Sequence, residues 1–283
     1  MNKLRGEPDA TGSGRYPTSL GLAWLLLFFV LAFSLSWVVW APLVSARTNG
    51  GASPPTWLHL VGSIGPALAA IVSVALSAGR SGLMELWHGL SIGRPGRLGW
   101  LICIGLPSLL FLAAVGAERL FQGSWPNLRL ALTSNEYPYL TSAELLGAQI
   151  FFYGIGEELG WRGVALPSLM SRMSALAASA LLTAPWALWH LPLFLTNETY
   201  IEMGVAGVVG WILSLLTGSV LMGWLFLATN RSVLVVATFH GLLDLAMVNP
   251  ALGPIGMNAA GALVTFVGMA AAVLLWRGPC EAK

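Results

Sequence analysis

Charged residues are scarce in this chain, and their scarcity excludes an ordinary water-facing surface. Asp, Glu, Lys and Arg make up 9% of the 283 residues, whereas 56% are hydrophobic. Soluble domains typically carry about 25% charged residues. The chain has only two cysteines. Cys103 lies in an apolar run and Cys280 in a polar tail, so no disulfide between them is expected. The slight basic excess gives no reason to expect nucleic-acid binding.

The sequence instead contains several long runs of apolar residues. About 20 helical residues cross the hydrocarbon core of a bilayer, and in lipid only helices and closed barrels satisfy every backbone polar group. The alternation typical of barrel strands is absent. The sequence therefore predicts an all-α polytopic integral membrane protein with about eight transmembrane helices. The predicted spans are Ser19 to Val44, Thr56 to Ala78, Leu98 to Ala117, Ser142 to Leu159, Ser174 to Leu195, Met203 to Thr229, Ser232 to Val248 and Ile255 to Trp276.

The basic residues predict the orientation, because cytoplasmic loops carry an excess of Lys and Arg. With the N-terminus inside, only Arg47, Arg119 and Arg129 of the 14 basic residues fall outside. Both termini are therefore expected in the cytoplasm, and the membrane is expected to be the plasma membrane. Residues 1–18 are predicted to form a disordered leader, residues 19–277 a single helical membrane domain, and residues 278–283 a cytoplasmic tail.

Ionisable side chains within the predicted spans are the strongest functional signal. Placing a charge at membrane depth costs roughly 2.5 to 3.5 kcal/mol on insertion scales, so such residues are usually paired and functional. They concentrate in the fourth, fifth and seventh spans, where packing has no need of them. The candidate catalytic residues are Glu157, Glu158, Arg162, His190, His240 and Asp244.

Helical spacing predicts different roles for the two glutamates of the fourth span. Glu158 and Arg162 are four residues apart and share a face, whereas Glu157 is turned about 100° away. We expect Arg162 to neutralise Glu158 and leave Glu157 as an unpaired carboxylate that acts as a general base. The alternative is that all three lie at the cytoplasmic interface as a solvated helix end. The glycines around this group are expected to permit close helix approach or water entry: Gly154, Gly156, Gly160 and Gly163.

The histidines differ in their surroundings. His190 follows Pro185 within the fifth span, and a kink at that proline is expected to aim it inward. His240 and Asp244 are four residues apart, so the carboxylate can fix the tautomer of the imidazole. His59 has no acidic neighbour in the sequence, and we expect it to be an interfacial residue. The segment from 121 to 141 is expected to be the largest outer loop.

These motifs resemble the CPBP family of CAAX proteases and bacteriocin-processing enzymes. The family pattern is Glu-Glu-x-x-x-Arg, then Phe-x-x-x-His, then His-x-x-x-Asn or Asp, on three spans. The first motif is complete here, the second has Trp186 in place of Phe, and the third ends in Asp244. The resemblance covers a core of about residues 145–248 and is closest to type II CAAX prenyl endopeptidases.

The resemblance implies roles for the site residues. Glu157 and His190 would activate a water molecule, while His240 and Asp244 would stand at the oxyanion. An ionised aspartate cannot donate a hydrogen bond to an oxyanion. Asp244 would therefore be protonated, orient His240, or bind a metal.

A metal is left open by the residues themselves. Two histidines with carboxylates are a plausible Zn²⁺ set, so the candidate ligands are Glu157, His190, His240 and Asp244. The cofactor is therefore either none or a divalent metal such as Zn²⁺. The family is commonly labelled metalloprotease, whereas its prenyl-protease branch is thought to use no bound metal, and we favour a glutamate mechanism.

The sequence as a whole favours an intramembrane endopeptidase that cleaves a peptide bond within the membrane or at its inner face. The expected partners are membrane lipid and a peptide or protein substrate, prenylated or not. Two alternatives remain open at this stage. One is a non-catalytic immunity or scaffold protein of the same family, and the other is a proton-coupled transporter that uses the Glu and His residues as a relay.

Overall fold

The computed structural model of the protein describes residues 20–49 and 54–278, which contain helices and no strand. The predicted leader, Cys280 and all but the first residue of the predicted tail lie outside the described residues. The helices are α1 (Leu22–Asn49), α2 (Trp57–Gly62), α3 (Gly65–His88), α4 (Gly96–Gln122), η1 (Leu128–Leu130), α5 (Ser142–Ala148), η2 (Gln149–Ile155), α6 (Gly156–Gly160), η3 (Trp161–Ala165), α7 (Leu166–Met170), α8 (Ala175–Trp189), η4 (Leu191–Leu195), α9 (Glu198–Ile201), α10 (Val205–Ala228), α11 (Val233–Met247) and α12 (Pro254–Trp276).

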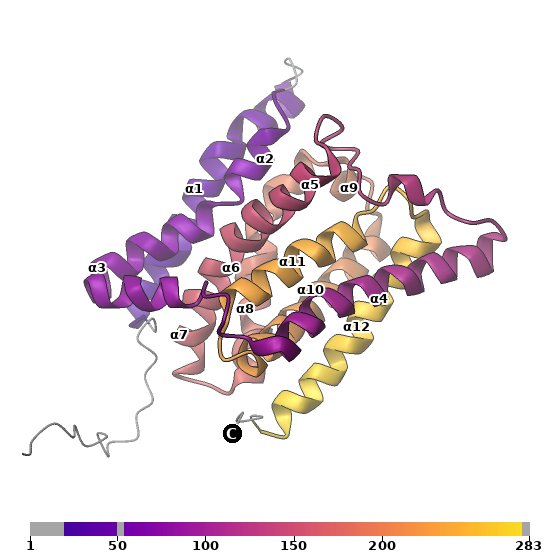
Figure 1. The fold of residues 1–283 in the computed structure, drawn as a ribbon. Coiled ribbons are helices and arrows are strands. Elements are labelled where there is room, and N and C mark those ends of the chain that lie inside the picture. Colours follow the sequence, from indigo (N-terminus) through magenta and orange to yellow (C-terminus); the bar gives the residue numbers. More distant parts are fainter. Residues whose placement is uncertain (1–19, 50–53, 279–283) are drawn as a thin grey trace, which may run out of the picture.

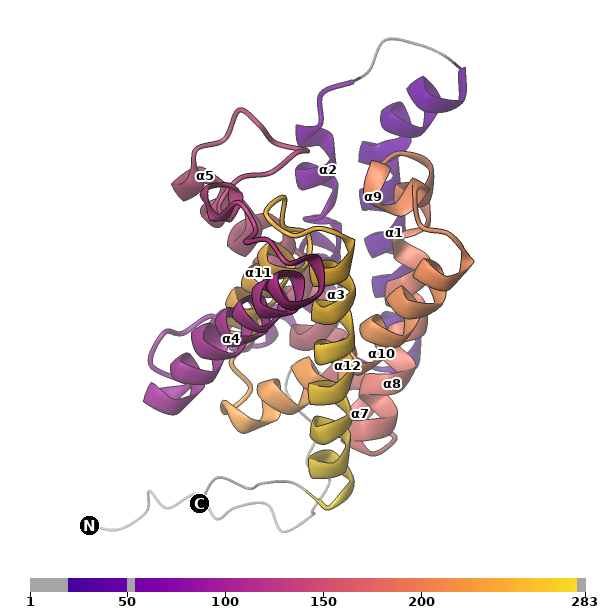
Figure 2. The same ribbon diagram turned by 90° about the vertical axis from the view of Figure 1, so that its right-hand side faces the viewer.

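The helices form a bundle in which one end gathers several short elements. In both views α2, α5 and α9 lie at the upper end and α7 lies toward the opposite end (Figure 1, Figure 2). Helix α11 packs against η2, α4 and α10, which places it inside the bundle. The all-α membrane architecture predicted from the apolar runs is therefore confirmed.

The number of spans stays a prediction. Among the described residues, six helical stretches are long and apolar enough to cross a membrane, and α11 is a shorter apolar helix. The six stretches are Leu22–Asn49, Trp57–His88, Gly96–Gln122, Ala175–Leu195, Val205–Ala228 and Pro254–Trp276. The continuous helical run from α5 to α7 corresponds to the fourth predicted segment and brings the number of these helical segments to eight among the described residues. All eight predicted segments are thus helical, whereas their crossing of a bilayer and the side on which the termini lie remain expectations.

Three boundaries differ from the sequence prediction. The fourth segment does not end at Leu159 but continues through η3 and α7 to Met170. The second segment is interrupted between α2 and α3 and again at Gly79, whose φ of 59° lies in a region that glycine tolerates. Helix α8 continues through Pro185 and ends at Trp189, so His190 caps the helix instead of lying within it.

Two π-helical segments, η2 and η3, flank the single α-helical turn of α6. Such π segments are often found at functional sites. The backbone of this run touches its neighbours directly. A side chain at Gly154 would collide with the carbonyl of Ala237, and one at Gly160 would lie 2.7 Å from the carbonyl of Pro66. Gly156 contacts Ser63 in the same way, so the close helix approach predicted for these glycines is confirmed.

Candidate active site

The acidic pair and its arginine lie in the interior of the bundle. Glu157 is 3% exposed, and Glu158 and Arg162 are fully buried. They belong to α6 and η3, in the middle of the run from Ser142 to Met170. The alternative interpretation, in which these residues form a solvated helix end, is therefore wrong. The reason is that the helix continues past Leu159 and carries the group into the core.

Glu158 and Arg162 form the ion pair that their spacing predicted. Arg162 Nη1 donates to Glu158 Oε1 at 2.7 Å, and Nη2 donates to Ser219 Oγ at 3.4 Å. The guanidinium group also lies over the ring of Trp186, 4.7 Å from its centroid. Arg162 is thus fixed by a carboxylate, a hydroxyl and an aromatic face, all of them buried.

Glu157 is held by a different set of donors. The indole nitrogens of Trp186 and Trp161 donate to its Oε2 at 2.8 Å and 3.3 Å. The hydrogen bond from Arg162 goes to Glu158 instead. Glu157 is therefore a buried carboxylate stabilised by neutral N–H donors, and one of its two oxygens carries both of these bonds. The sequence analysis treated Trp186 only as an aromatic equivalent of phenylalanine and missed its hydrogen bond.

His190 has its tautomer fixed by the main chain. Its Nδ1 lies 2.7 Å from the carbonyl oxygen of Trp186. A carbonyl oxygen only accepts, so Nδ1 carries the hydrogen and Nε2 of the neutral ring keeps a lone pair. His190 is 8% exposed and packs among the rings of Trp189, Tyr200 and Trp211. In its neutral form the ring of His190 therefore has one basic nitrogen, Nε2.

His240 lies between two carboxylates. Its Nδ1 is 2.8 Å from Glu158 Oε1, and its Nε2 is 3.5 Å from Asp244 Oδ2. The side chain of His240 is 6% exposed, whereas that of Asp244 is 38% exposed. The sequence predicted the contact with Asp244 from the helical spacing. The contact with Glu158 joins α11 to α6, and nothing local in the sequence indicated it.

Trp186 connects the parts of the site. Its ring centroid lies 6.0 Å from that of His190 and 5.6 Å from that of His240, and its indole binds Glu157. The structure therefore brings together all six residues that the sequence selected, from η3, α6, α11 and the end of α8. Glu157 and His190 both contact Trp186, the first through the indole nitrogen and the second through the ring.

The candidate metal ligands do not form a ready metal site. Within residues 20–49 and 54–278, no group of three or more His, Cys, Asp or Glu side chains is placed so that it could hold a metal ion. Two of the four candidates also have competing partners, because Oε2 of Glu157 accepts from two indoles and both ring nitrogens of His240 lie against carboxylates. This donor set does not fit a bound Zn²⁺ in the present arrangement.

A second polar cluster near the site was missed by the sequence analysis. His59 was expected to be interfacial and without acidic neighbours, but it is 8% exposed and its Nδ1 lies 2.7 Å from Glu136 Oε1. The hydroxyls of Tyr137 and Tyr153 join the cluster, 2.6 Å from each other. Asn197 donates to Glu136 Oε2 at 2.9 Å. The expectation failed because these partners are remote in sequence, with Glu136 lying 77 positions from His59.

Glu136 ties the loop between α4 and α5 to the rest of the bundle. Burial alone would raise the pKa of this carboxyl, but His59, the Tyr137 hydroxyl and the Asn197 amide outweigh burial and lower it. The charged carboxylate is therefore the stable form in the folded protein. The predicted outer loop is thus fastened at Glu136 to α2 and to the segment before α9.

Replacing Glu136 should release this loop. Glu136→Gln removes charge-assisted hydrogen bonds worth roughly 1 to 3 kcal/mol, and 1.4 kcal/mol corresponds to a factor of ten. We expect trypsin to cut at Arg129, an exposed residue of the loop, about tenfold faster in the variant. Glu198→Gln is the control, because Glu198 forms only an exposed pair with Arg47. Equal cutting rates in both variants would contradict the fastening role of Glu136.

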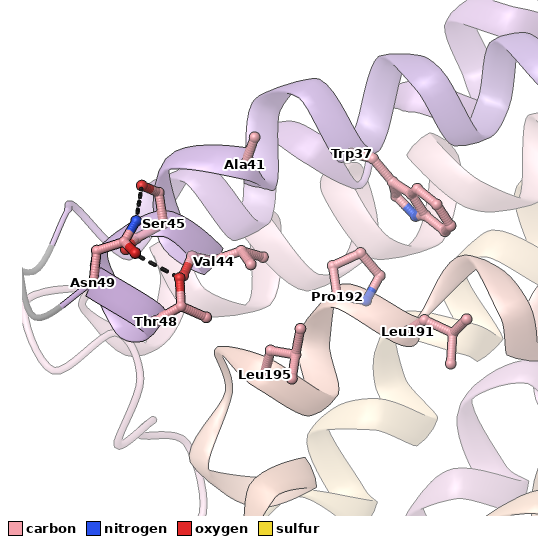
Figure 3. Close-up of a pocket in the computed structure, with 9 residues that line it drawn as sticks. All are labelled: Trp37, Ala41, Val44, Ser45, Thr48, Asn49, Leu191, Pro192 and Leu195. Carbon is pink, nitrogen blue, oxygen red and sulfur yellow. Dashed lines mark hydrogen bonds between the residues drawn. The ribbon is translucent and has the colours of Figure 1, made fainter.

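The surface also has a hollow of about 610 Å³ between α1 and η4 (Figure 3). It is mainly apolar along Ala41, Val44, Leu191 and Leu195, and polar at Ser45, Thr48 and Asn49. None of the candidate catalytic residues lines it. It is therefore separate from the buried cluster, although Leu191 directly follows His190.

The segment that contains this site is similar in sequence to known proteins. Residues 139–246 match a family described as "Type II CAAX prenyl endopeptidase Rce1-like". Over 93 residues, 31% of the chain, the sequence is 37% identical to a protein named "CAAX prenyl protease 2" from Methanococcus maripaludis. The aligned region spans 34% of that relative's length. Both matches support a CAAX prenyl endopeptidase-like (CPBP) family, as the three motifs indicated.

Proposed function

We propose that this CAAX-protease-like integral membrane protein is an endopeptidase that cleaves a peptide bond with a water molecule activated by Glu157. The observation that carries the proposal is the division between the two buried glutamates. Glu158 is engaged by Arg162 and His240, whereas Glu157 is bound only through one oxygen by neutral indoles. A buried carboxylate kept apart from the arginine is suited to accept a proton.

The proposed reaction follows from the positions of the donors and acceptors. Glu157 takes a proton from water while the water oxygen attacks the carbonyl carbon of the substrate. His190 accepts a hydrogen bond from the same water through its free Nε2, which fixes the direction of attack. The tetrahedral intermediate then collapses, the C–N bond breaks, and Glu157 returns the proton to the leaving nitrogen.

Asp244 has an orienting role in this proposal. Of the three options that the sequence left open, the contact between Asp244 and Nε2 of His240 supports the one in which the carboxylate orients the imidazole. Glu158 holds the other ring nitrogen. The oxyanion role that the resemblance implies for His240 and Asp244 stays a prediction.

The first test is cleavage of quenched fluorescent peptides, prenylated and plain, by the purified full-length protein in detergent. A preference for prenylated peptides would assign the substrate class that the relative's name suggests. Cleavage of plain peptides alone would point to another membrane-associated peptide. No cleavage of any peptide by folded protein would overturn the proposal and favour an immunity or scaffold role.

Chelation should leave the cleavage intact. The proposed mechanism needs no metal, because Glu157 and His190 activate the water directly. We expect the rate after dialysis against EDTA or 1,10-phenanthroline to stay within about twofold of the untreated rate. A loss that added Zn²⁺ restores would contradict the glutamate mechanism and show that the ligands rearrange around a metal.

A further inference from the structure

Trp186 stands where the pattern of the resembled family has phenylalanine, four residues before His190. Both side chains are aromatic, but an indole carries one hydrogen-bond donor and a phenyl ring carries none. Trp186 is 3% exposed, so its N–H needs a partner within the protein. That partner is Oε2 of Glu157, at 2.8 Å. The tryptophan therefore adds a polar contact to the site, and the inference drawn from it rests on the proposed function.

The main chain of Trp186 holds a second site residue. In a regular α-helix the main-chain N–H of His190 would donate to the carbonyl of Trp186, four positions earlier. Here α8 ends at Trp189 and its last turn is tighter, so this N–H donates to the carbonyl of Ala187 at 3.2 Å. The carbonyl oxygen of Trp186 instead lies 2.7 Å from Nδ1 of the His190 ring. The end of α8 thus ties the imidazole to the residue that binds Glu157.

The indole ring of Trp186 is itself fixed by its neighbours. The guanidinium group of Arg162 lies over the ring, 4.7 Å from its centroid. The ring of His240 stands at 89° to the indole, with the two centroids 5.6 Å apart. These contacts set the plane of the indole, and that plane sets the direction in which its N–H points.

Two indoles bind Glu157, but they fix it against different elements. Trp161 lies four residues after Glu157 in the same helical run, and its bond is the longer one, at 3.3 Å. Trp186 belongs to α8 and lies 29 positions away. Both bonds end at Oε2, and within the described part of the chain Oε1 accepts no hydrogen bond. The bond from Trp186 therefore fixes Glu157 relative to α8 and leaves Oε1 available to a water molecule.

We propose that Trp186 is the positioning residue of the water-activating pair: its indole N–H holds Oε2 of Glu157 and its carbonyl holds His190, so that Oε1 and Nε2 face one water molecule. Oε1 takes the proton when the water O–H bond breaks, and the water oxygen uses its electron pair to bond the carbonyl carbon. Trp186 exchanges no proton in this step. Its contribution is geometric, so its loss lowers the rate of the chemical step more than it weakens substrate binding.

Replacing the indole N–H alone is the sharpest test. β-(3-Benzothienyl)alanine at position 186 keeps the shape of the ring and puts sulfur in place of the N–H. A net hydrogen bond corresponds to a factor of about five, and a misplaced catalytic group costs up to about 100-fold. We therefore expect kcat to fall by about 5- to 100-fold, with KM changed by less than about twofold. 5-Fluorotryptophan at the same position keeps the N–H and should keep kcat within about twofold of the wild type.

The matched control is the same analogue at position 40. Trp40 is fully buried, and its indole donates to the carbonyl of His59 at 3.1 Å. This control loses a buried indole hydrogen bond that ends on a main-chain carbonyl instead of on Glu157, so kcat should stay within about twofold of the wild type. A fall of less than about fivefold at position 186, or an equal fall at position 40, would overturn the proposal.

A double substitution separates positioning from packing. In the Glu157→Gln background no carboxylate is left to orient, so the benzothienyl analogue at position 186 should change the residual rate by less than about twofold. If Trp186 only packed the core, the analogue would lower this residual rate by the same factor as it lowers the wild-type rate. That outcome would overturn the proposal.

A spectroscopic measurement applies even if the variants at position 186 fail to fold. In isotope-labelled protein the indole proton resonance of Trp186 should move upfield in Glu157→Gln, because a neutral amide oxygen accepts a weaker hydrogen bond than a carboxylate does. The resonance of Trp40 should stay in place, and an unmoved Trp186 resonance would overturn the proposal. Failure of the proposed function itself looks different, because wild-type protein would then cleave no peptide or Glu157→Gln would remain active.

Discussion

Glu157→Gln is expected to reduce peptide cleavage by about 10²- to 10⁴-fold, the range typical of a lost general base. Glutamine has nearly the same shape, and its amide oxygen can still accept from the indoles of Trp161 and Trp186. The variant should therefore fold and insert like the wild type while lacking a group that accepts the water proton. The measurement is the steady-state rate on any peptide that the wild type cleaves.

The control for this substitution is Glu202→Gln, which changes an exposed carboxylate after α9. Its rate should match that of the wild type. Thermal unfolding of both variants in the same detergent checks that the loss is chemical. If Glu157→Gln cleaves as fast as the wild type, the water is activated by another group and the assignment of Glu157 is wrong.

Arg162→Met is expected to cause the largest loss of stability. Arg162 is fully buried and donates to Glu158, so its removal leaves a buried carboxylate without its main cation. Removing one partner of a buried ion pair typically costs about 3 to 5 kcal/mol. Thermal or denaturant unfolding in detergent measures the change, and the variant is expected to unfold well below the wild type.

Two comparisons make this result specific to the buried pair. Arg94→Ala breaks the more exposed pair with Glu85 and should cost about 1 kcal/mol or less. Adding Glu158→Gln to Arg162→Met removes the stranded charge and should recover part of the stability. If the Arg162 and Arg94 variants unfold alike, or if the second substitution adds to the loss, the buried pair does not have the structural importance assigned to it.

Helical periodicity predicted some of the contacts in the candidate site but not others. The spacing of four residues predicted the contacts of Glu158 with Arg162 and of His240 with Asp244, and both are present. The same reasoning placed Glu157 on another face but gave no partner for it. Its strongest donor, Trp186, lies 29 positions away on α8, and only the packing of α8 against the fourth segment brings the indole to the carboxylate.

Helical periodicity could not predict the polar cluster around His59 or the position of Tyr200. His59, Glu136, Tyr153 and Asn197 come from four separate parts of the chain, so no local pattern joins them. Tyr200 stands outside the three motifs, and nothing in its local sequence indicates a contact with His190. Its place beside His190 depends on the turn made by η4 and on contact with Trp211 of α10.

The sequence by itself determined the class of structure and the chemical groups of the site. Apolar runs of membrane length leave helices as the way to satisfy the backbone, and charges within those runs are costly enough to indicate function. Tertiary structure alone decided that the acidic pair is buried, that His240 lies between Glu158 and Asp244, and that Trp186 donates to Glu157. The reason is physical: spacing along a helix fixes neighbours within about one turn, whereas contacts between helices depend on how their surfaces pack.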